Sequence, residues 1–439
     1  SHEILTAKKV GQLIEQASQT TLDNDWDRSN LEGMRKKYLN AVSLPNKLVK
    51  ALTECSLECT QAWRKYRQAN DWKSFAPYLK KVVELVKESA NTRAQKFGLD
   101  PYDILLDDFS TGVTQAYIDP IFDQLRKEIP EILSQVKQQK QFKDLSGDYP
   151  LEQQKNLARH VMQSIGFDFN YGRLDESHHP FCGGSPRDVR ITTRYDNQNF
   201  IPGLMGICHE TGHAMYERHL PAQWLDQPVG AAVGMTIHES QSLLVEMQAC
   251  RTQAFSQYIT QLFPQFFPDH DKISESDFYA SCTHVQPDLI RVDADEVTYP
   301  LHIILRYEIE KQLLNDTIGV DDLPELWDQM MQELLGISTR GNDKDGVMQD
   351  VHWPSALFGY FPAYTLGAIF AAQQMVKVNQ QYPNAIEKLA KGDFSEIMAW
   401  LQKNVHAQAS LYDTPGLIKQ ATGEPLTSKY FIAHLRQRY

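Results

Sequence analysis

Residues 204–215 of the chain read LMGICHETGHAM, a segment in which two histidines stand four positions apart. Side chains at this spacing lie on the same face of a helix, so His209 and His213 can bind one metal ion. Glu210 lies one step round the helix, where its carboxylate can hold a water molecule instead of binding the metal. Apolar residues flank the motif, as they do in a buried helix. The segment therefore predicts a buried helix that carries part of a metal site.

A second carboxylate, Glu239, follows the motif within the helix-like run 238–246. Gly230 and Gly234 precede this run and are suited to turns, so a loop and a returning helix would bring Glu239 back to the two imidazoles. Three protein ligands would leave one position of a zinc ion open for water or substrate, as catalytic zinc requires. The pattern predicts a zinc-dependent hydrolase, and the alternative is a chance occurrence of the motif.

The composition narrows the class of protein further. The 439-residue chain has a formal net charge of −12, which argues against binding to nucleic acid. No apolar run approaches the length of a membrane span, and the first residues do not resemble a signal peptide. The six cysteines are scattered, without the pairs of a disulfide framework. We therefore expect a cytoplasmic protein that binds neither nucleic acid nor a membrane.

Helical spacing dominates the chain. The first 165 residues place apolar side chains at helical intervals, and prolines bound these runs. The pattern changes to strand-like alternation at 167–171 and 189–195, on either side of a loop rich in glycine and proline. Helical spacing resumes at Leu204 and continues to the C-terminus. We predict a mainly α fold with a single domain over residues 1–439, in which a large helical body surrounds a deep substrate cleft and a small antiparallel β-sheet lies beside the metal site.

Hydrolysis of a peptide also needs donors near the carbonyl oxygen on which charge develops. Tyr364 and His352 are candidates, because nearby glycine and proline indicate a shaped loop, although each could instead be a core residue. Arg291 lies between apolar residues and suits recognition of a carboxylate, since its planar guanidinium can meet both oxygens. The alternative for Arg291 is a structural ion pair with a nearby acid. The segment 188–192 could offer backbone groups to an extended peptide, or only hold the sheet together.

Six short motifs together resemble those of the carboxypeptidase Taq family of metallocarboxypeptidases. They stand in the family's order, and weaker similarity extends over most of the chain. The motifs are His179-Pro180-Phe181, DxRxT at Asp188, Arg190 and Thr192, HExxH at 209–213, His238-Glu239-Ser240-Gln241, IRxxAD at Ile290, Arg291, Ala294 and Asp295, and GxxQDxHW at Gly346, Gln349, Asp350, His352 and Trp353. Their joint presence has essentially no explanation by chance.

The resemblance implies a role for each candidate residue. The metal ligands would be His209, His213 and Glu239. Glu210 would be the catalytic carboxylate and Arg291 the anchor for the C-terminus of the substrate. His352 and Tyr364 would lie near the scissile carbonyl. The further residues expected in substrate binding are Asp188, Arg190, Thr192, His238, Gln349 and Asp350.

The resemblance also implies one Zn2+ ion, or Co2+, per chain and a homodimer. Family members remove residues one at a time from peptides with a free C-terminus, with broad specificity that disfavours proline. They usually begin with an additional helical hairpin, which we expect this chain to lack. Two alternatives remain open. One is an endo-acting helical zinc oligopeptidase, which would not need a free C-terminus, and the other is a binding protein with a vestigial site.

Overall fold

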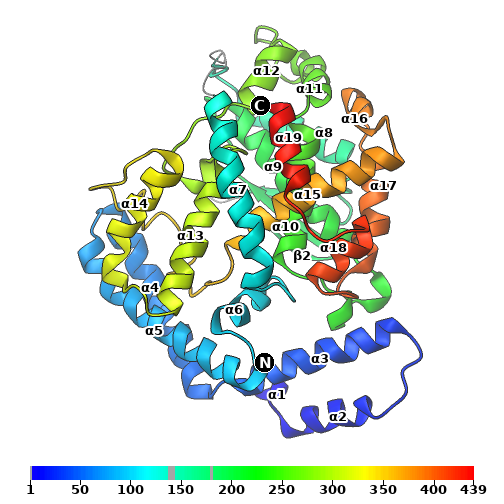
Figure 1. The fold of residues 1–439 in the computed structure, drawn as a ribbon. Coiled ribbons are helices and arrows are strands. Elements are labelled where there is room, and N and C mark those ends of the chain that lie inside the picture. The colour runs from blue at the N-terminus through cyan, green and yellow to red at the C-terminus, as the bar shows by residue number, and fades with distance from the viewer. Residues whose placement is uncertain (1, 137–143, 178–180) are drawn as a thin grey trace. The chain divides into compact units, whose positions relative to one another are not determined.

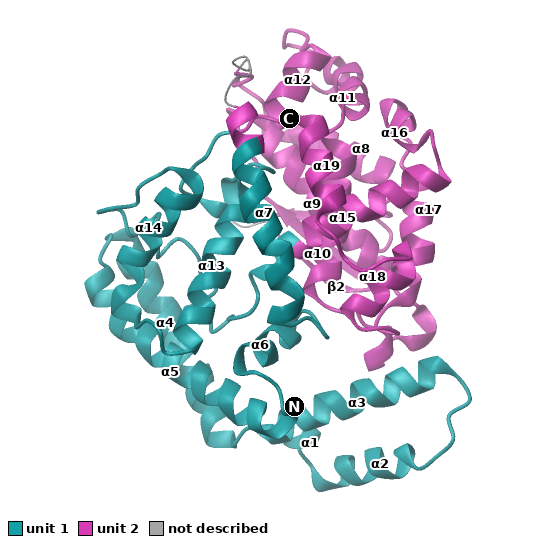
Figure 2. Cartoon of the chain, viewed as in Figure 1, with its two compact units in different colours: residues 1–131, 286–365 teal, residues 132–285, 366–439 magenta. Residues whose placement is uncertain are grey.

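A computed structural model describes residues 2–136, 144–177 and 181–439. Helices make up most of these residues, and a small β-sheet accompanies them (Figure 1). The mainly α fold predicted from the hydrophobic spacing is confirmed. By its internal contacts the chain divides into two compact units, residues 1–131 with 286–365 and residues 132–285 with 366–439 (Figure 2). The single domain expected from the sequence stays a prediction.

The first unit is built from helices whose buried faces follow the predicted spacing. In α5 (Trp72–Phe97), for example, Asp71 accepts the backbone N–H of Ser74 at the start, and Gly98 ends the helix with a φ of 68°. The helices of this unit are α1 (His2–Leu5), α2 (Lys8–Ser18), α3 (Asp25–Ser43), α4 (Asn46–Gln68), α5, α6 (Pro101–Phe109), most of α7 (Gln115–Val136), η4 (Arg291–Asp293), α13 (Tyr299–Leu314), η5 (Val320–Asp322), α14 (Leu323–Leu335) and the start of α15 (Pro362–Gln381).

Helix α13 carries buried polar residues along one of its faces. His302, Arg306 and Glu310 recur at intervals of four residues, and each is fully buried. Asp295 precedes the helix and accepts the backbone N–H groups of Val297 and Thr298. Because buried charged groups need partners, this face of α13 indicates a polar cluster in the interior of the first unit.

The second unit combines helices with the β-sheet. Its strands are β1 (Gly172–Glu176), β2 (Phe181–Ser185) and β3 (Asp188–Thr193). Its helices are α8 (Leu151–Ile165), α9 (Phe200–Arg218), η1 (Ala222–Trp224), η2 (Pro228–Gly230), α10 (Met235–Leu243), the π-helical η3 (Leu244–Cys250), α11 (Gln253–Phe266), α12 (Glu275–Cys282), most of α15, α16 (Ala385–Lys388), η6 (Leu389–Lys391), α17 (Ser395–Asn404), η7 (His406–Gln408), α18 (Thr414–Thr422) and α19 (Lys429–Arg438).

The sheet differs in two respects from the one predicted. Its strand order is β1-β3-β2, and β3 runs antiparallel to β2 but parallel to β1, so the sheet is mixed rather than antiparallel. Residues 167–171 form a turn instead of a strand, because the Asp168 side chain accepts the backbone N–H of Asn170. The rings of Phe167 and Phe169 contact each other beside this turn, with their centroids 4.9 Å apart. Local side-chain contacts therefore outweigh the alternation of the sequence here.

Strand β3 has one buried face and one open face. Val189, Ile191 and Thr193 are buried, whereas Asp188, Arg190 and Thr192 lie on the opposite face. Since β3 is the central strand, its backbone groups pair with both neighbours. It therefore does not offer an extended peptide a free backbone edge, the first of the two roles that the sequence suggested for segment 188–192.

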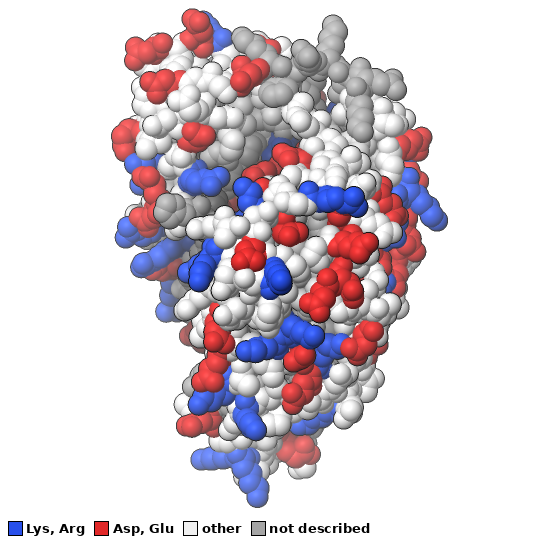
Figure 3. All heavy atoms as spheres, turned by 90° about the vertical axis from the view of Figure 1, so that its left-hand side faces the viewer, with Lys and Arg blue, Asp and Glu red and all other residues white. Residues whose placement is uncertain are grey.

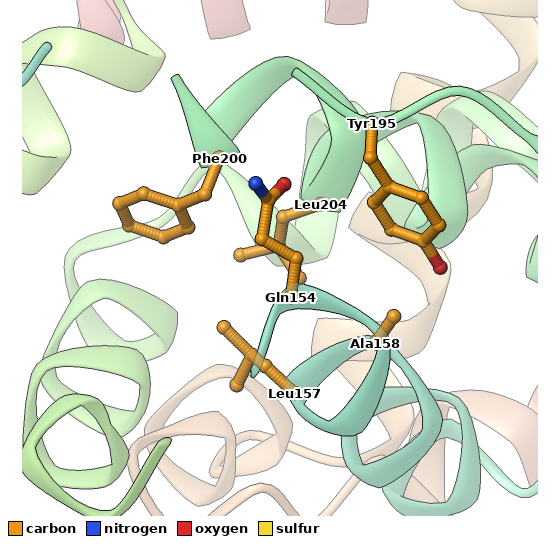
Figure 4. A pocket seen from close by; sticks show the side chains of 6 residues that line it. All are labelled: Gln154, Leu157, Ala158, Tyr195, Phe200 and Leu204. Carbon is orange, nitrogen blue, oxygen red and sulfur yellow. The ribbon is translucent and has the colours of Figure 1, made fainter. Parts of the chain in front are cut away.

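A cavity of about 10 Å³ lies between α8 and the start of α9 (Figure 4). It is lined by Gln154, Leu157, Ala158, Tyr195, Phe200 and Leu204. The Oε1 atom of Gln154 and the hydroxyl of Tyr195 are buried and have no hydrogen-bond partner among the described residues. A volume of this size can hold one water molecule. The cavity is too small for a substrate.

Acidic and basic side chains lie among one another on the face of the molecule drawn in Figure 3. Within the described part of the chain, every helix is too short or too polar to cross a membrane.

Candidate active site

Helices α9 and α10 bring the three predicted metal ligands together in the second unit. The ligand atoms of His209, His213 and Glu239 all lie within 4.8 Å of one another. His209 Nε2 is 3.7 Å from Glu239 Oε1, and His213 Nε2 is 3.4 Å from Glu239 Oε2. Ligand atoms bound to zinc at about 2.0–2.2 Å with tetrahedral angles lie about 3.3–3.6 Å apart. The donor set therefore fits an ion of this kind.

Two glycines allow α9 and α15 to approach α10, which carries Glu239, so closely. A Cβ atom on Gly212 would lie 2.5 Å from the carbonyl oxygen of Gln241 and 2.6 Å from the Cα of Ser242. A Cβ atom on Gly367 of α15 would lie 2.9 Å from the Cβ of Glu239. Real Cβ atoms almost never come this near to a neighbour, so a larger residue at either position would displace α10 and with it Glu239.

A carboxylate behind His209 fixes the orientation of that imidazole. His209 Nδ1 lies 2.9 Å from Glu246 Oε2, and Arg251 Nη2 donates to the other carboxylate oxygen at 2.7 Å. Because Glu246 accepts the Nδ1–H, Nε2 is left to bind a metal. Glu246 is not among the site residues predicted from the sequence. Its spacing of seven residues from Glu239, about two helical turns, was the available signal.

His213 is held by a histidine and a carboxylate in series. Its Nδ1 lies 2.6 Å from His238 Nδ1, and His238 Nε2 lies 2.9 Å from Glu217 Oε1. With Nε2 of His213 reserved for a metal, its Nδ1–H donates to His238, and the Nε2–H of His238 donates to Glu217. This assignment satisfies every ring nitrogen. The structure thus places His238 behind a metal ligand, and its role in binding substrate stays a prediction.

Glu210 lies in a low-dielectric environment beside the ligands. The residue is 7% exposed. Burial raises the pKa of its carboxyl to about 7, and Glu239 and Glu246 act in the same direction, against His209. Burial lowers the pKa of His209, but Glu239 and Glu246 outweigh it and raise the value to about 10. Burial lowers the pKa of His213 to about 4. The site is thus a buried cluster of carboxylates and imidazoles, which suits a divalent cation.

A second cluster lies in the first unit and is centred on Arg291, which begins η4. Arg291 donates from Nε and Nη2 to Asp350 Oδ1, at 3.1 and 2.7 Å, and from Nη1 to the Tyr299 hydroxyl at 2.8 Å. Its backbone N–H donates to Gln349 Oε1 at 2.8 Å. The ion pair with an acid that the sequence left open is therefore present, and the acid is Asp350. The role of Arg291 as an anchor stays a prediction.

His352 and Tyr364 belong to this same cluster. His352 Nε2 lies 3.1 Å from the Tyr364 hydroxyl, and the Tyr364 ring centroid is 5.0 Å from the guanidinium carbon of Arg291. Burial lowers the pKa of His352 to about 3, so its imidazole is neutral near pH 7. The structure thus brings together Arg291, Gln349, Asp350, His352 and Tyr364, which are distributed over more than 70 positions of the sequence.

The remaining motif residues lie on the sheet. Arg190 Nη2 pairs with Asp188 Oδ2 at 2.8 Å, and both side chains are exposed. Thr192 pairs with Phe181 across the sheet, and Phe181 is 65% exposed. His179 and Pro180, the other residues of their motif, lie outside the described residues. The proposed contacts of these residues with substrate stay predictions.

The chain is similar to known carboxypeptidases along its whole length. A family model described as carboxypeptidase Taq (M32) metallopeptidase matches residues 1–439. The chain is 35% identical to thermostable carboxypeptidase 1 of Thermus thermophilus, over 100% of this chain and 88% of that protein. It is 36% identical to carboxypeptidase 1 of Bacillus subtilis, over 99% and 88%. The solved structure of Trypanosoma cruzi metallocarboxypeptidase 1 matches with a TM-score of 0.97 and 38% identity, over 100% of this chain and 89% of that one.

The fold is mainly helical, and the HExxH helix supplies two histidines that a carboxylate joins as the third ligand. These features define a metallopeptidase. The chain belongs to the carboxypeptidase Taq (M32) family of metallopeptidases. It is a metallocarboxypeptidase, and the resemblance seen in the sequence motifs is confirmed.

Proposed function

We propose that the protein removes residues one at a time from peptides with a free C-terminus, with broad specificity that disfavours proline. The observation that carries this proposal is the metal centre, in which three ligands converge and each imidazole has its own partner. The names of the relatives, thermostable carboxypeptidase 1 and carboxypeptidase 1, support the same activity. Digestion of a mixed peptide library, followed by mass spectrometry, would test both the stepwise removal and the stop at proline.

We propose one zinc ion per chain, held by His209, His213 and Glu239. Two imidazoles and a carboxylate are a common ligand set of catalytic zinc, and cobalt suits the same donors. When bound, the metal polarises the scissile carbonyl and lowers the pKa of a water molecule. Elemental analysis of the purified protein would identify the ion, and Glu239→Gln should reduce its occupancy.

Glu210 is the proposed general base and acid. It accepts a proton from the attacking water and then delivers this proton to the leaving amine. Glu210→Gln keeps the shape of the side chain but removes the base, so we expect turnover to fall by about 10²–10⁴-fold while the metal remains bound. Unchanged turnover in a metal-loaded Glu210→Gln variant would contradict this role.

Arg291 is the proposed anchor for the C-terminal carboxylate of the substrate. Described residues engage three of its five N–H donors, so one N–H on each terminal nitrogen is left for a bidentate contact with a carboxylate. Gln349 and Asp350 hold the arginine in place. His352 and Tyr364 are proposed to lie near the scissile carbonyl as donors to its oxygen, and His238, Asp188, Arg190 and Thr192 to support substrate binding.

We further propose a cytoplasmic homodimer. All six cysteines are free, which suits a reducing compartment, and the dimer follows from the family resemblance. Sedimentation equilibrium would test the dimer.

The two alternatives are an endo-acting oligopeptidase and a vestigial binding protein. An oligopeptidase would cut a peptide and its C-terminally amidated twin equally well, and a binding protein would cut neither.

A further inference from the structure

A single carboxylate in the first unit is shared by two buried arginines. Arg306 donates from Nε to Asp350 Oδ2 at 2.7 Å, and its Nη2 lies 2.6 Å from the same oxygen. Arg291 uses the other oxygen, Oδ1. The two guanidinium groups therefore occupy opposite oxygens of Asp350, and neither arginine excludes the other.

The packing around Arg306 leaves it no freedom to reach a substrate. Its side chain is 0% exposed, and Nη1 donates to the backbone carbonyl of His302 at 2.7 Å. The guanidinium carbon lies 4.6 Å from the ring centroid of Trp327 and 5.3 Å from that of Phe361. The Phe361 ring also contacts Arg291, at 5.6 Å. Arg306 can thus act on a ligand only through Asp350 and Arg291.

The charges of the three ion-paired side chains, Arg291, Arg306 and Asp350, do not balance. Two arginines face one aspartate, so the three side chains carry a net charge of +1. His302 and His352 add no charge, because burial lowers the pKa of each to about 3. Glu310 follows Arg306 by one turn of α13, and its carboxyl accepts from the Tyr102 hydroxyl, the Trp353 Nε1–H and the backbone N–H of Gly359. These donors and the charge of Arg306 favour its anion, but burial outweighs them and raises its pKa to about 7, so near neutral pH Glu310 balances the positive charge only in part.

An unbalanced buried charge is costly, and the group of Arg291, Arg306 and Asp350 keeps a positive charge that Glu310 offsets only in part, so this group favours binding of a further anion. Without Arg306, the Arg291–Asp350 pair would be neutral and would attract a carboxylate only weakly. With Arg306 present, its guanidinium neutralises the charge of Asp350 through Oδ2, the oxygen that Arg291 does not use. The positive charge of Arg291 then remains available to a ligand.

We propose that Arg306 is a positioning residue for recognition of the C-terminal carboxylate: it neutralises Asp350 so that Arg291 can bind the anion. This inference rests on the proposed anchor role of Arg291. It also requires that the charge of Arg306, which pairs with Asp350 Oδ2, sets the affinity of the protein for the substrate.

The test uses the full-length, metal-loaded protein and a short N-acetylated oligoalanine peptide with its amidated twin. The KM and kcat of the acid are measured, and the amide is assayed as a substrate or competitive inhibitor. We expect Arg306→Met to raise KM for the acid by about tenfold or more, with little change in kcat or in affinity for the amide. Arg306→Lys, the matched control, keeps the charge and should change KM much less.

A charge-restoring variant separates electrostatics from a structural role. In the double variant Arg306→Met/Asp350→Asn, Arg291 is again left with an uncompensated positive charge. We expect this double variant to recover most of the affinity for the acid that Arg306→Met loses. A purely structural role for Arg306 predicts no recovery. If the single variant Arg306→Met does not fold, the double variant alone tests the inference. A folded double variant that still prefers the acid to the amide supports the charge effect, because a purely structural role predicts that this preference is lost.

Two outcomes would overturn the inference: a folded Arg306→Met variant with the wild-type KM for the acid, or a folded double variant that has lost the preference for the acid. Metal content and thermal denaturation establish folding. Arg291→Met distinguishes this failure from failure of the proposed function. If Arg291→Met still prefers the acid, the anchor itself is wrong; if it loses the preference while Arg306→Met keeps it, only the role of Arg306 is wrong.

Discussion

Replacing Glu246 by glutamine should weaken metal binding without removing any of the three ligands. Glu246 accepts the Nδ1–H of His209 at 2.9 Å and the Nη2–H of Arg251 at 2.7 Å. The glutamine keeps one carbonyl oxygen for His209, but it loses the negative charge and turns an amide N–H2 toward Arg251. His209 then becomes a weaker base and a less well oriented ligand.

The size of the effect follows from these contacts. Loss of an outer-shell partner typically lowers metal affinity by about 10- to 100-fold, which corresponds to about 1.4–2.7 kcal/mol. We expect a value in the upper part of this range, because Arg251 is mostly buried and loses its ionic partner at the same time. The matched control is Glu217→Gln, which acts on His213 only through His238. Its effect should be smaller, since one imidazole still separates it from the ligand.

The assay is a competition titration of zinc between the protein and a chelator of known affinity, with thermal denaturation as a check on folding. A folded Glu246→Gln variant with wild-type zinc affinity would refute the outer-shell role of Glu246. An equal loss in Glu217→Gln would refute the distinction between a direct and an indirect partner.

Further predictions concern close packing and pH dependence. Gly212→Ala places a Cβ atom 2.5 Å from the carbonyl oxygen of Gln241, so α10 must move; we expect about tenfold or greater loss of zinc affinity, measured by the same titration. Burial raises the pKa of Glu310 from an ordinary value of 4.5 to about 7, so the folded state binds this proton more tightly than the unfolded state. The resulting stability is present below pH 4.5 and is lost as the pH rises to 7. The destabilisation caused by Glu310→Gln, measured by denaturant unfolding, should therefore shrink by about 3 kcal/mol across this window. A constant difference would contradict the raised pKa.

The metal ligands could be predicted from the sequence because their geometry is local. His209 and His213 are one helical turn apart, and Glu239 returns within a single loop and helix. Glu246 could not be predicted in the same way, because its position does not follow regular α-helical geometry. It lies beyond the change from α10 to the π-helical η3, and a carboxylate on a helix is usually a solvated one, so the sequence gives little sign that Glu246 is buried.

The ion pairs around Arg291 could not be predicted from the sequence. The carboxylate that binds Arg291 comes from Asp350, 59 positions later, and the second arginine of the cluster lies on a third segment. Pairings over such distances depend on the packing of whole helices rather than on local spacing. The stripe of His302, Arg306 and Glu310 was visible as a helical repeat, but only the structure shows that all three are buried. The same limit explains the mixed sheet, because strand pairing is not encoded in strand alternation.

The central claim is that the metal centre removes C-terminal residues, and the most direct test compares one short peptide with its C-terminally amidated twin. The assay uses protein loaded with zinc or cobalt, with and without a chelator. We expect stepwise loss of terminal residues from the free peptide, little or no cleavage of the amide, and no activity with chelator. Internal cleavage of both peptides, or cleavage that survives removal of the metal, would contradict the claim.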